Sequence, residues 1–101
     1  MKSEMMDKIV AVVAEVCEVP ALEIRSTTKK GDVVEARCIF VQYCRAYGIA
    51  PAVIAKFLNR KRTISVYDHL RNYYIYRKQS FSFRNLCREV EAKLTDSYPR
   101  T

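Results

Sequence analysis

The chain has 101 residues, of which 18 are lysine or arginine and 11 are aspartate or glutamate, giving a formal net charge of +7. This length suits a single domain with a modest core, and the basic balance favours polyanionic partners. No apolar stretch approaches the ~20 residues that span a bilayer, and no signal-peptide pattern is visible, so we expect a cytoplasmic protein without a membrane partner.

Helical periodicity fills the first part of the chain. Apolar residues recur at three- and four-residue spacing over residues 3–17, which predicts an amphipathic helix with Ser3 as its N-cap. Pro20 suits the first position of a short helical turn over residues 21–24. The polar and cationic residues 25–31 then predict an exposed loop, because so many charges cannot be buried.

Two further helices are predicted in the middle of the chain. Asp32 is a candidate N-cap for a helix that runs to Tyr47 and stops at Gly48, since glycine tolerates the left-handed conformation of a helix end. Pro51 opens a short helix over residues 51–58.

The last third of the chain predicts two more helices, over residues 63–78 and 83–94, with a break at 80–82 and a frayed tail at 95–101. Glycine occurs at two positions only, which leaves strands and hairpins little turn chemistry. We therefore predict an all-α fold, one domain over residues 1–101 built as a compact bundle of about six helices. The apolar residues expected to join the fourth and fifth helices, and to support them from beneath, are Ile54, Phe57, Leu58, Val66, Leu70, Ile9, Val13, Ile39 and Val41.

Charge is unevenly distributed along the chain. Residues 1–23 hold five acids against two bases, whereas residues 56–78 hold seven bases against Asp68 alone. The run at the start of the fifth helix is Arg60, Lys61, Arg62, Thr63, Ile64 and Ser65. Cations suit phosphates, hydroxyls suit base edges and isoleucine suits a thymine methyl group, while Thr63 is also a candidate N-cap. A helical pair joined by such a turn, here over residues 50–78, is typical of a helix-turn-helix that binds double-stranded DNA.

Metal and catalytic chemistry are not expected. Cys17, Cys38, Cys44 and Cys87 form no C-x-x-C pair and fall in apolar helical patterns, so we expect buried side chains rather than zinc ligands. His69 has no cysteine or carboxylate at ligand spacing. Because no catalytic triad or glycine-rich phosphate loop is visible, we expect no enzyme activity, no cofactor and no small-molecule substrate.

Three segments follow one another in the order found in a known DNA-binding domain. Ala21–Ser26 with Lys29 and Lys30 is similar to V-x-D-L-R-S-K-x-R-K, Val33–Arg37 to I-V-x-A-R, and Ala50–Leu58 to L-P-E-I-G-x-x-F. The chain thereby resembles the C-terminal domain of the bacterial replication initiator DnaA over about residues 6–74, and more loosely to residue 94. No ATPase module adjoins it, so we expect the binding domain alone, as in a standalone or mobile-element protein.

The resemblance implies a Trp-repressor-like helix-turn-helix and a nucleoid-associated role in replication or transcription. Lys29 takes the position of an arginine that enters the minor groove, with Arg25 and Lys30 as neighbours, and Arg37 and Arg45 match cations near phosphates. The family's G-R-D-H-T-T-V segment departs here, where Arg62 replaces the aspartate, Thr63 the histidine and Ile64 the first threonine. These changes imply a duplex site other than the family's, with guanine where Arg62 reads it.

Two alternatives stay open at this level. Tyr67, Tyr73, Tyr74 and Tyr76 could stack on single-stranded bases, although their helical spacing favours a core position. The whole chain could instead be a protein-interaction module that reuses the fold, with the acidic first helix or the last helix seating a partner or a second copy. Retention on mixed-sequence DNA separates the two functions.

Overall fold

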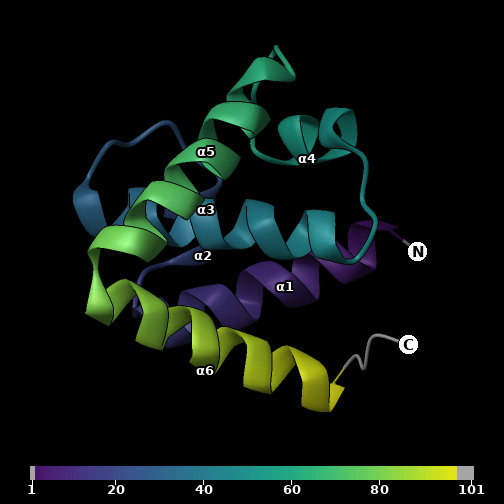
Figure 1. Cartoon of the computed structure of the whole chain (residues 1–101). Helices are drawn as coiled ribbons and strands as arrows, with labels where there is room; N and C mark the ends of the chain where they lie inside the picture. The colour runs from purple at the N-terminus through teal and green to yellow at the C-terminus, as the bar shows by residue number, and fades with distance from the viewer. Residues whose placement is uncertain (1, 98–101) are drawn as a thin grey trace.

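A computed structural model describes residues 2–97, and every regular element within them is a helix, as the sequence predicts. The helices are α1 (Lys2–Cys17), α2 (Ala21–Ile24), α3 (Gly31–Ala46), α4 (Pro51–Phe57), α5 (Ile64–Gln79) and α6 (Phe81–Ser97). The central helix is α3, which contacts α1, α2, α4 and α5. In Figure 1, α1 and α6 lie below α3 and α4 lies above it, while α5 crosses from above α3 down to the start of α6. No described helix combines the length and apolar content that a membrane crossing requires.

All six helices contribute to one core. Its largest fully buried side chains are Tyr73, Phe40, Phe83, Ile9, Ile24, Ile39, Ile54, Leu58, Leu94, Val13, Val33 and Val41. The rings of Phe40 and Phe57 stack with their centroids 5.4 Å apart, and Tyr73 meets Phe83 edge-on at 5.6 Å. The predicted residues between α4 and α5 are buried, apart from Leu70, which is partly buried against the same core. The radius of gyration is 12.2 Å, close to the ~13 Å of a compact domain of this length.

Three helices end in the same backbone motif. Gly48 follows α3 with φ 84°, as predicted, and the amide of Ile49 donates to the carbonyl of Cys44 at 3.0 Å. Glu18 after α1 and Asn59 after α4 take the same left-handed conformation, with φ 57° and 59°. This Schellman motif satisfies carbonyls that the helix end leaves without partners. In α1 and α4 it places a residue with a Cβ where glycine is preferred.

The starts of α3 and α5 differ from the predicted caps. Helix α3 begins two residues earlier than expected, so Asp32 lies inside its first turn and Lys30 occupies the N-cap position. Thr63 does occupy the N-cap position of α5, but its backbone is in the right-handed helical region and its hydroxyl makes no capping hydrogen bond. A capping side chain requires extended backbone to reach the free amides, which Thr63 lacks.

Helix α6 is longer than the sequence indicates. It starts at Phe81, because Ser80 alone breaks the chain direction and its hydroxyl accepts a hydrogen bond from the amide of Phe83 at 3.1 Å. Its end lies at Ser97, so residues 95–97 of the predicted tail are helical. Leu94 is buried in the core and anchors this last part of the helix. Residues 98–101 lie outside the described residues.

Candidate nucleic-acid interface

Two basic segments far apart in the sequence are joined by side-chain hydrogen bonds, which we call the clasp. We call residues 25–30 the basic loop and residues 59–63 the basic turn. The Nε of Arg25 donates to the carbonyl of Phe57 at 3.0 Å. In return, the side-chain amide nitrogen Nδ2 of Asn59 donates to the carbonyl of Arg25 at 3.1 Å. Arg60 adds a bond from Nη2 to the carbonyl of Ser26 at 3.1 Å. The two segments therefore form one surface.

Arg25 also stabilises this clasp through its guanidinium, which lies 4.0 Å from the centroid of the Phe57 ring. A guanidinium over an aromatic face is attracted by the negative face of the ring. Arg25 is half-buried as a result, so it contributes positive charge to the surface without extending freely into solvent.

The structure corrects the prediction that Arg37 contacts DNA phosphate. It exposes 2 % of its surface, and its guanidinium donates at 2.8–3.0 Å to the carbonyls of Glu23, Ile24, Ser26 and Thr28. Burial, followed by the charge of Arg60, lowers the pKa of Arg37. Because its donors are used inside the protein, Arg37 shapes the basic loop from beneath and is not available to a phosphate in this conformation.

The clasp carries four exposed cations and borders a groove that Lys29 and Arg60 help to line. Lys29, Lys30, Lys61 and Arg62 are exposed, with Lys30 Nζ 3.9 Å from a carboxylate oxygen of Glu23. A cavity of about 330 Å³ separates the basic loop from α5. Its lining residues are Thr27, Lys29, Val34, Arg37, Arg60, Ser65, Asp68, His69 and Asn72. Of the predicted site residues, Lys29, Arg37, Arg60 and Ser65 line this groove.

The first turn of α5 borders this groove through Ser65 and has no capping side chain. It has no acidic residue, and the amides of Ser65 and Val66 donate to the carbonyls of Arg62 and Thr63 at 3.4 and 2.9 Å, so what this turn offers an anion is the positive end of the helix dipole. Ile64 is 63 % exposed. The hydroxyl of Ser65 donates to the carbonyl of Arg62 at 2.9 Å, which holds it within the basic turn.

Arg45 lies apart from the clasp. It follows Arg37 by eight residues on α3, about 12 Å along the helix axis. Its Nη1 donates to the carbonyl of Ile49 at 2.9 Å, which closes the end of α3. Arg45 is exposed, but the groove does not include it.

His69 is a residue of the groove that the sequence reasoning did not select. Both of its ring nitrogens are buried without a hydrogen-bond partner in the described part of the chain. Burial, then the charges of Arg37 and Arg60, lower the pKa of His69 to about 4, so the ring is neutral near pH 7. The spacing of Ser65, Asp68, His69 and Asn72 on one side of α5 is the sequence signal that could have indicated this wall.

The tyrosines of α5 divide between core and surface. Tyr73 is buried at 2 % exposure, in line with the core position that the spacing favours, whereas Tyr67 and Tyr74 are 56 % and 55 % exposed. The expected buried stripe, which ran through Tyr67 and either Tyr73 or Tyr74, is therefore wrong for Tyr67 and confirmed for Tyr73. Tyr67, Arg71, Tyr74 and Lys78 lie at three- and four-residue spacing along an exposed side of the helix.

The described residues contain no group of three or more histidine, cysteine, aspartate or glutamate side chains that could hold a metal ion. Cys38, Cys44 and Cys87 are buried and Cys17 is partly buried, all as free thiols. Burial raises the pKa of Cys38 to about 12, so that thiol stays protonated.

Comparisons with known proteins add no relative to this geometry. No family model, curated protein or solved structure matches the chain. The function is therefore argued from the clasp, the groove and the first turn of α5.

Proposed function

We propose that the chain is a double-stranded DNA-binding domain without enzyme activity, in which α4 and α5 act as a helix-turn-helix. The observation that carries this proposal is the clasp, whose hydrogen bonds join the segment that holds Lys29 and Lys30 to the segment that holds Lys61 and Arg62, directly before α5. Cations and the positive end of a helix dipole both attract DNA phosphates. The resemblance to the DnaA C-terminal domain, including a role in replication or transcription, is part of the same proposal.

In this arrangement the parts have separate roles. The basic loop contacts a groove edge or the backbone through Lys29 and Lys30, while the basic turn and the first turn of α5 enter the major groove. Arg62 is exposed there, and an arginine prefers guanine because it can donate to N7 and O6 together. The exposed Ile64 offers an apolar contact for a thymine methyl group.

The test begins with a selection of bound duplexes from a random library. On the selected site, Arg62→Ala should reduce binding by roughly 1–3 kcal/mol and relax the choice at one base pair. Lys8→Ala, an exposed lysine of α1 away from the clasp, is the control and should leave affinity and choice unchanged. Equal losses for Arg62→Ala on every single-base variant mean that Arg62 contacts phosphate only. A library that yields no enriched duplex removes the DNA proposal.

A second function is favoured by the exposed side of α5. Ile64, Tyr67, Tyr74 and Ile75 are 63 %, 56 %, 55 % and 42 % exposed, an unusual number of large apolar side chains for one helix. The apolar sides of α1 and α6 are instead buried within the core. A protein-interaction module would therefore use α5 rather than those helices. Loss of a partner on Tyr67→Ser with Tyr74→Ser, combined with no DNA retention, would favour this function.

A further inference from the structure

A second cavity lies at the other end of α5, where α3, α5 and α6 meet. It has a volume of about 190 Å³ and its lining residues are Gln42, Tyr43, Ala46, Tyr73, Arg77, Arg84, Cys87, Arg88 and Glu91. Arg77 follows Ile64 by thirteen residues, about 20 Å along the helix. The cavity shares no lining residue with the groove beside the basic loop, whose lining on α5 ends at Asn72, next to Tyr73 of the cavity.

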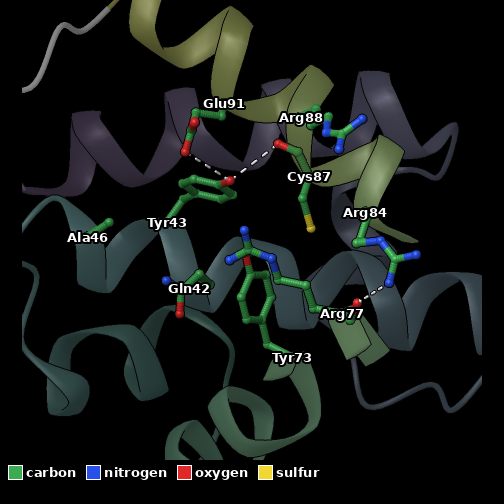
Figure 2. Close-up of a pocket in the computed structure, with 9 residues that line it drawn as sticks. All are labelled: Gln42, Tyr43, Ala46, Tyr73, Arg77, Arg84, Cys87, Arg88 and Glu91. Atoms are coloured by element: carbon green, nitrogen blue, oxygen red, sulfur yellow. Dashed lines mark hydrogen bonds between the residues drawn. The ribbon is translucent and has the colours of Figure 1, made fainter. Parts of the chain in front are cut away.

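Three arginines dominate the charge of this cavity. Figure 2 shows Arg77 reaching across the centre, beside Tyr73, while Arg84 and Arg88 come from α6. Arg84 is held in place, because its Nη1 donates to the carbonyl of Arg77 at 2.7 Å at the end of α5. In the part of the chain that the structure describes, no ion pair joins Arg77, Arg84 or Arg88 to a carboxylate.

Apart from Glu91, the remaining polar groups of the cavity carry no charge at neutral pH. The hydroxyl of Tyr43 donates to the carbonyl of Cys87 at 3.2 Å and lies 3.5 Å from a carboxylate oxygen of Glu91. Burial raises the pKa of Tyr43, and raises that of Tyr73 to about 12, so both hydroxyls keep their protons at neutral pH. Glu91 is the one acid among the lining residues, against three guanidinium groups.

An anion placed in this cavity would be attracted by three guanidinium groups, two of which, those of Arg77 and Arg88, are exposed and able to turn toward it. We propose that it binds a phosphate monoester or inorganic phosphate, with Arg77 and Arg88 as the principal contacts and Arg84 as a fixed neighbouring charge. A phosphate monoester carries close to two negative charges at pH 7 and offers three acceptor oxygens, which arginine can bind in pairs. The volume is below the ~300 Å³ where cavities for larger organic ligands begin, so the site suits a phosphate group rather than a large molecule.

The test is isothermal titration calorimetry at constant ionic strength with inorganic phosphate, methyl phosphate and dimethyl phosphate. The first two should bind saturably at one site, and the diester, with a single charge, should bind more weakly. Arg77→Ala and Arg88→Ala should each reduce the affinity for phosphate by about tenfold or more. Arg71→Ala is the matched control: Arg71 is an exposed arginine of the same helix, outside the cavity and 3.2 Å from Asp68. It should leave the affinity unchanged.

Two results overturn the proposal. Absence of saturable heat, or equal losses for Arg71→Ala and Arg77→Ala, means that phosphate only screens the basic surface. Equal binding of the diester together with weaker duplex binding by Arg77→Ala means that the cavity contacts a nucleic-acid backbone instead. A variant with Lys29→Ala and Lys61→Ala should still bind phosphate, so failure of the proposed DNA function is distinguishable from failure of this site.

Discussion

The guanidinium of Arg37 donates to four carbonyl oxygens of residues 23–28, and no carboxylate is among these partners. Backbone carbonyls in a loop lack the hydrogen-bond donors that a helix or sheet supplies. The buried guanidinium of Arg37 donates to these carbonyls instead. The position of the basic loop, and of Lys29 within it, therefore depends on a cation that is itself inaccessible.

Replacing Arg37 tests this structural role. Arg37→Lys should lower the free energy of unfolding by about 3 kcal/mol or more, because a lysine cannot reproduce the planar donor set and leaves buried carbonyls without partners. Arg45→Lys, an exposed arginine of the same helix with one carbonyl partner, should change stability by less than about 0.5 kcal/mol. Denaturant unfolding measures both. Similar losses for the two variants would contradict the role assigned to Arg37.

His69 makes the stability of the fold depend on pH. Its folded pKa of about 4 is below the ordinary value of 6.5, so the unfolded chain binds the proton more readily between these values. The stabilisation is complete above about pH 6.5 and is lost as the pH falls toward 4, with a slope of at most about 1.4 kcal/mol per pH unit.

The measurement compares the pH dependence of unfolding in the parent chain and in His69→Asn. The carboxylates titrate in both proteins, so the difference between the two curves isolates His69. We expect the parent to lose more stability than the variant between pH 6.5 and 4. Parallel curves would mean that the imidazole is not shielded as the structure indicates.

At the scale of elements, the helix ends set the directions in which the chain turns. The Schellman motif after α4 leads directly into the basic turn, and the amide of Arg60 donates to the carbonyl of Ala55 at 2.8 Å within it. The same motif after α1 places Glu18 at φ 57°. A left-handed conformation is strained for a residue with a Cβ and strain-free for glycine.

Glu18→Gly should therefore stabilise the protein by about 0.5–1 kcal/mol, since relief of backbone strain exceeds the added freedom of the unfolded chain. Ala11→Gly is the matched control within α1. Ala11 is exposed in the helix interior, where glycine should destabilise by about 1 kcal/mol. Thermal unfolding of the two variants shows whether each is more or less stable than the parent protein. A destabilised Glu18→Gly variant would show that the left-handed position is not strained.

For the whole molecule, the charge is organised into two separated basic regions. The clasp and the groove lie at the start of α5, and the cavity with three arginines lies at its end. A basic protein attracts polyanions over its whole surface. To hold a DNA backbone in one position, however, its cations must themselves have fixed positions. The hydrogen bonds of the clasp supply that fixation at the first region.

The salt dependence of duplex binding tests this whole-molecule picture. If Lys29, Lys30, Arg60, Lys61 and Arg62 each neutralise one phosphate, the slope of log K against log salt should be about −4.5. Lys61→Ala should make the slope less steep by about 0.9, whereas Lys8→Ala should leave it unchanged. A slope near zero contradicts duplex binding through these cations.

The sequence by itself determined the helical class, the stop at Gly48, the start at Pro51 and the buried residues between α4 and α5, such as Phe57. These features depend on periodicity and on local backbone preferences, which neighbouring residues carry. The sequence did not predict the left-handed helix end at Asn59, which lacks a glycine, or the full length of α6. Packing against distant segments decides both features.

Only the tertiary structure decided which cations reach the surface. Arg37 and Arg62 are the same residue type, yet one is buried under carbonyls from another segment and the other is exposed. Likewise, the spacing of the tyrosines does not predict that Tyr73 is buried in the core while Tyr74 is exposed. The helical period shows which residues share a side of the helix, but not which side is covered by other helices. The role of a charged or aromatic side chain depends on the groups that surround it, and segments distant in the sequence supply those groups.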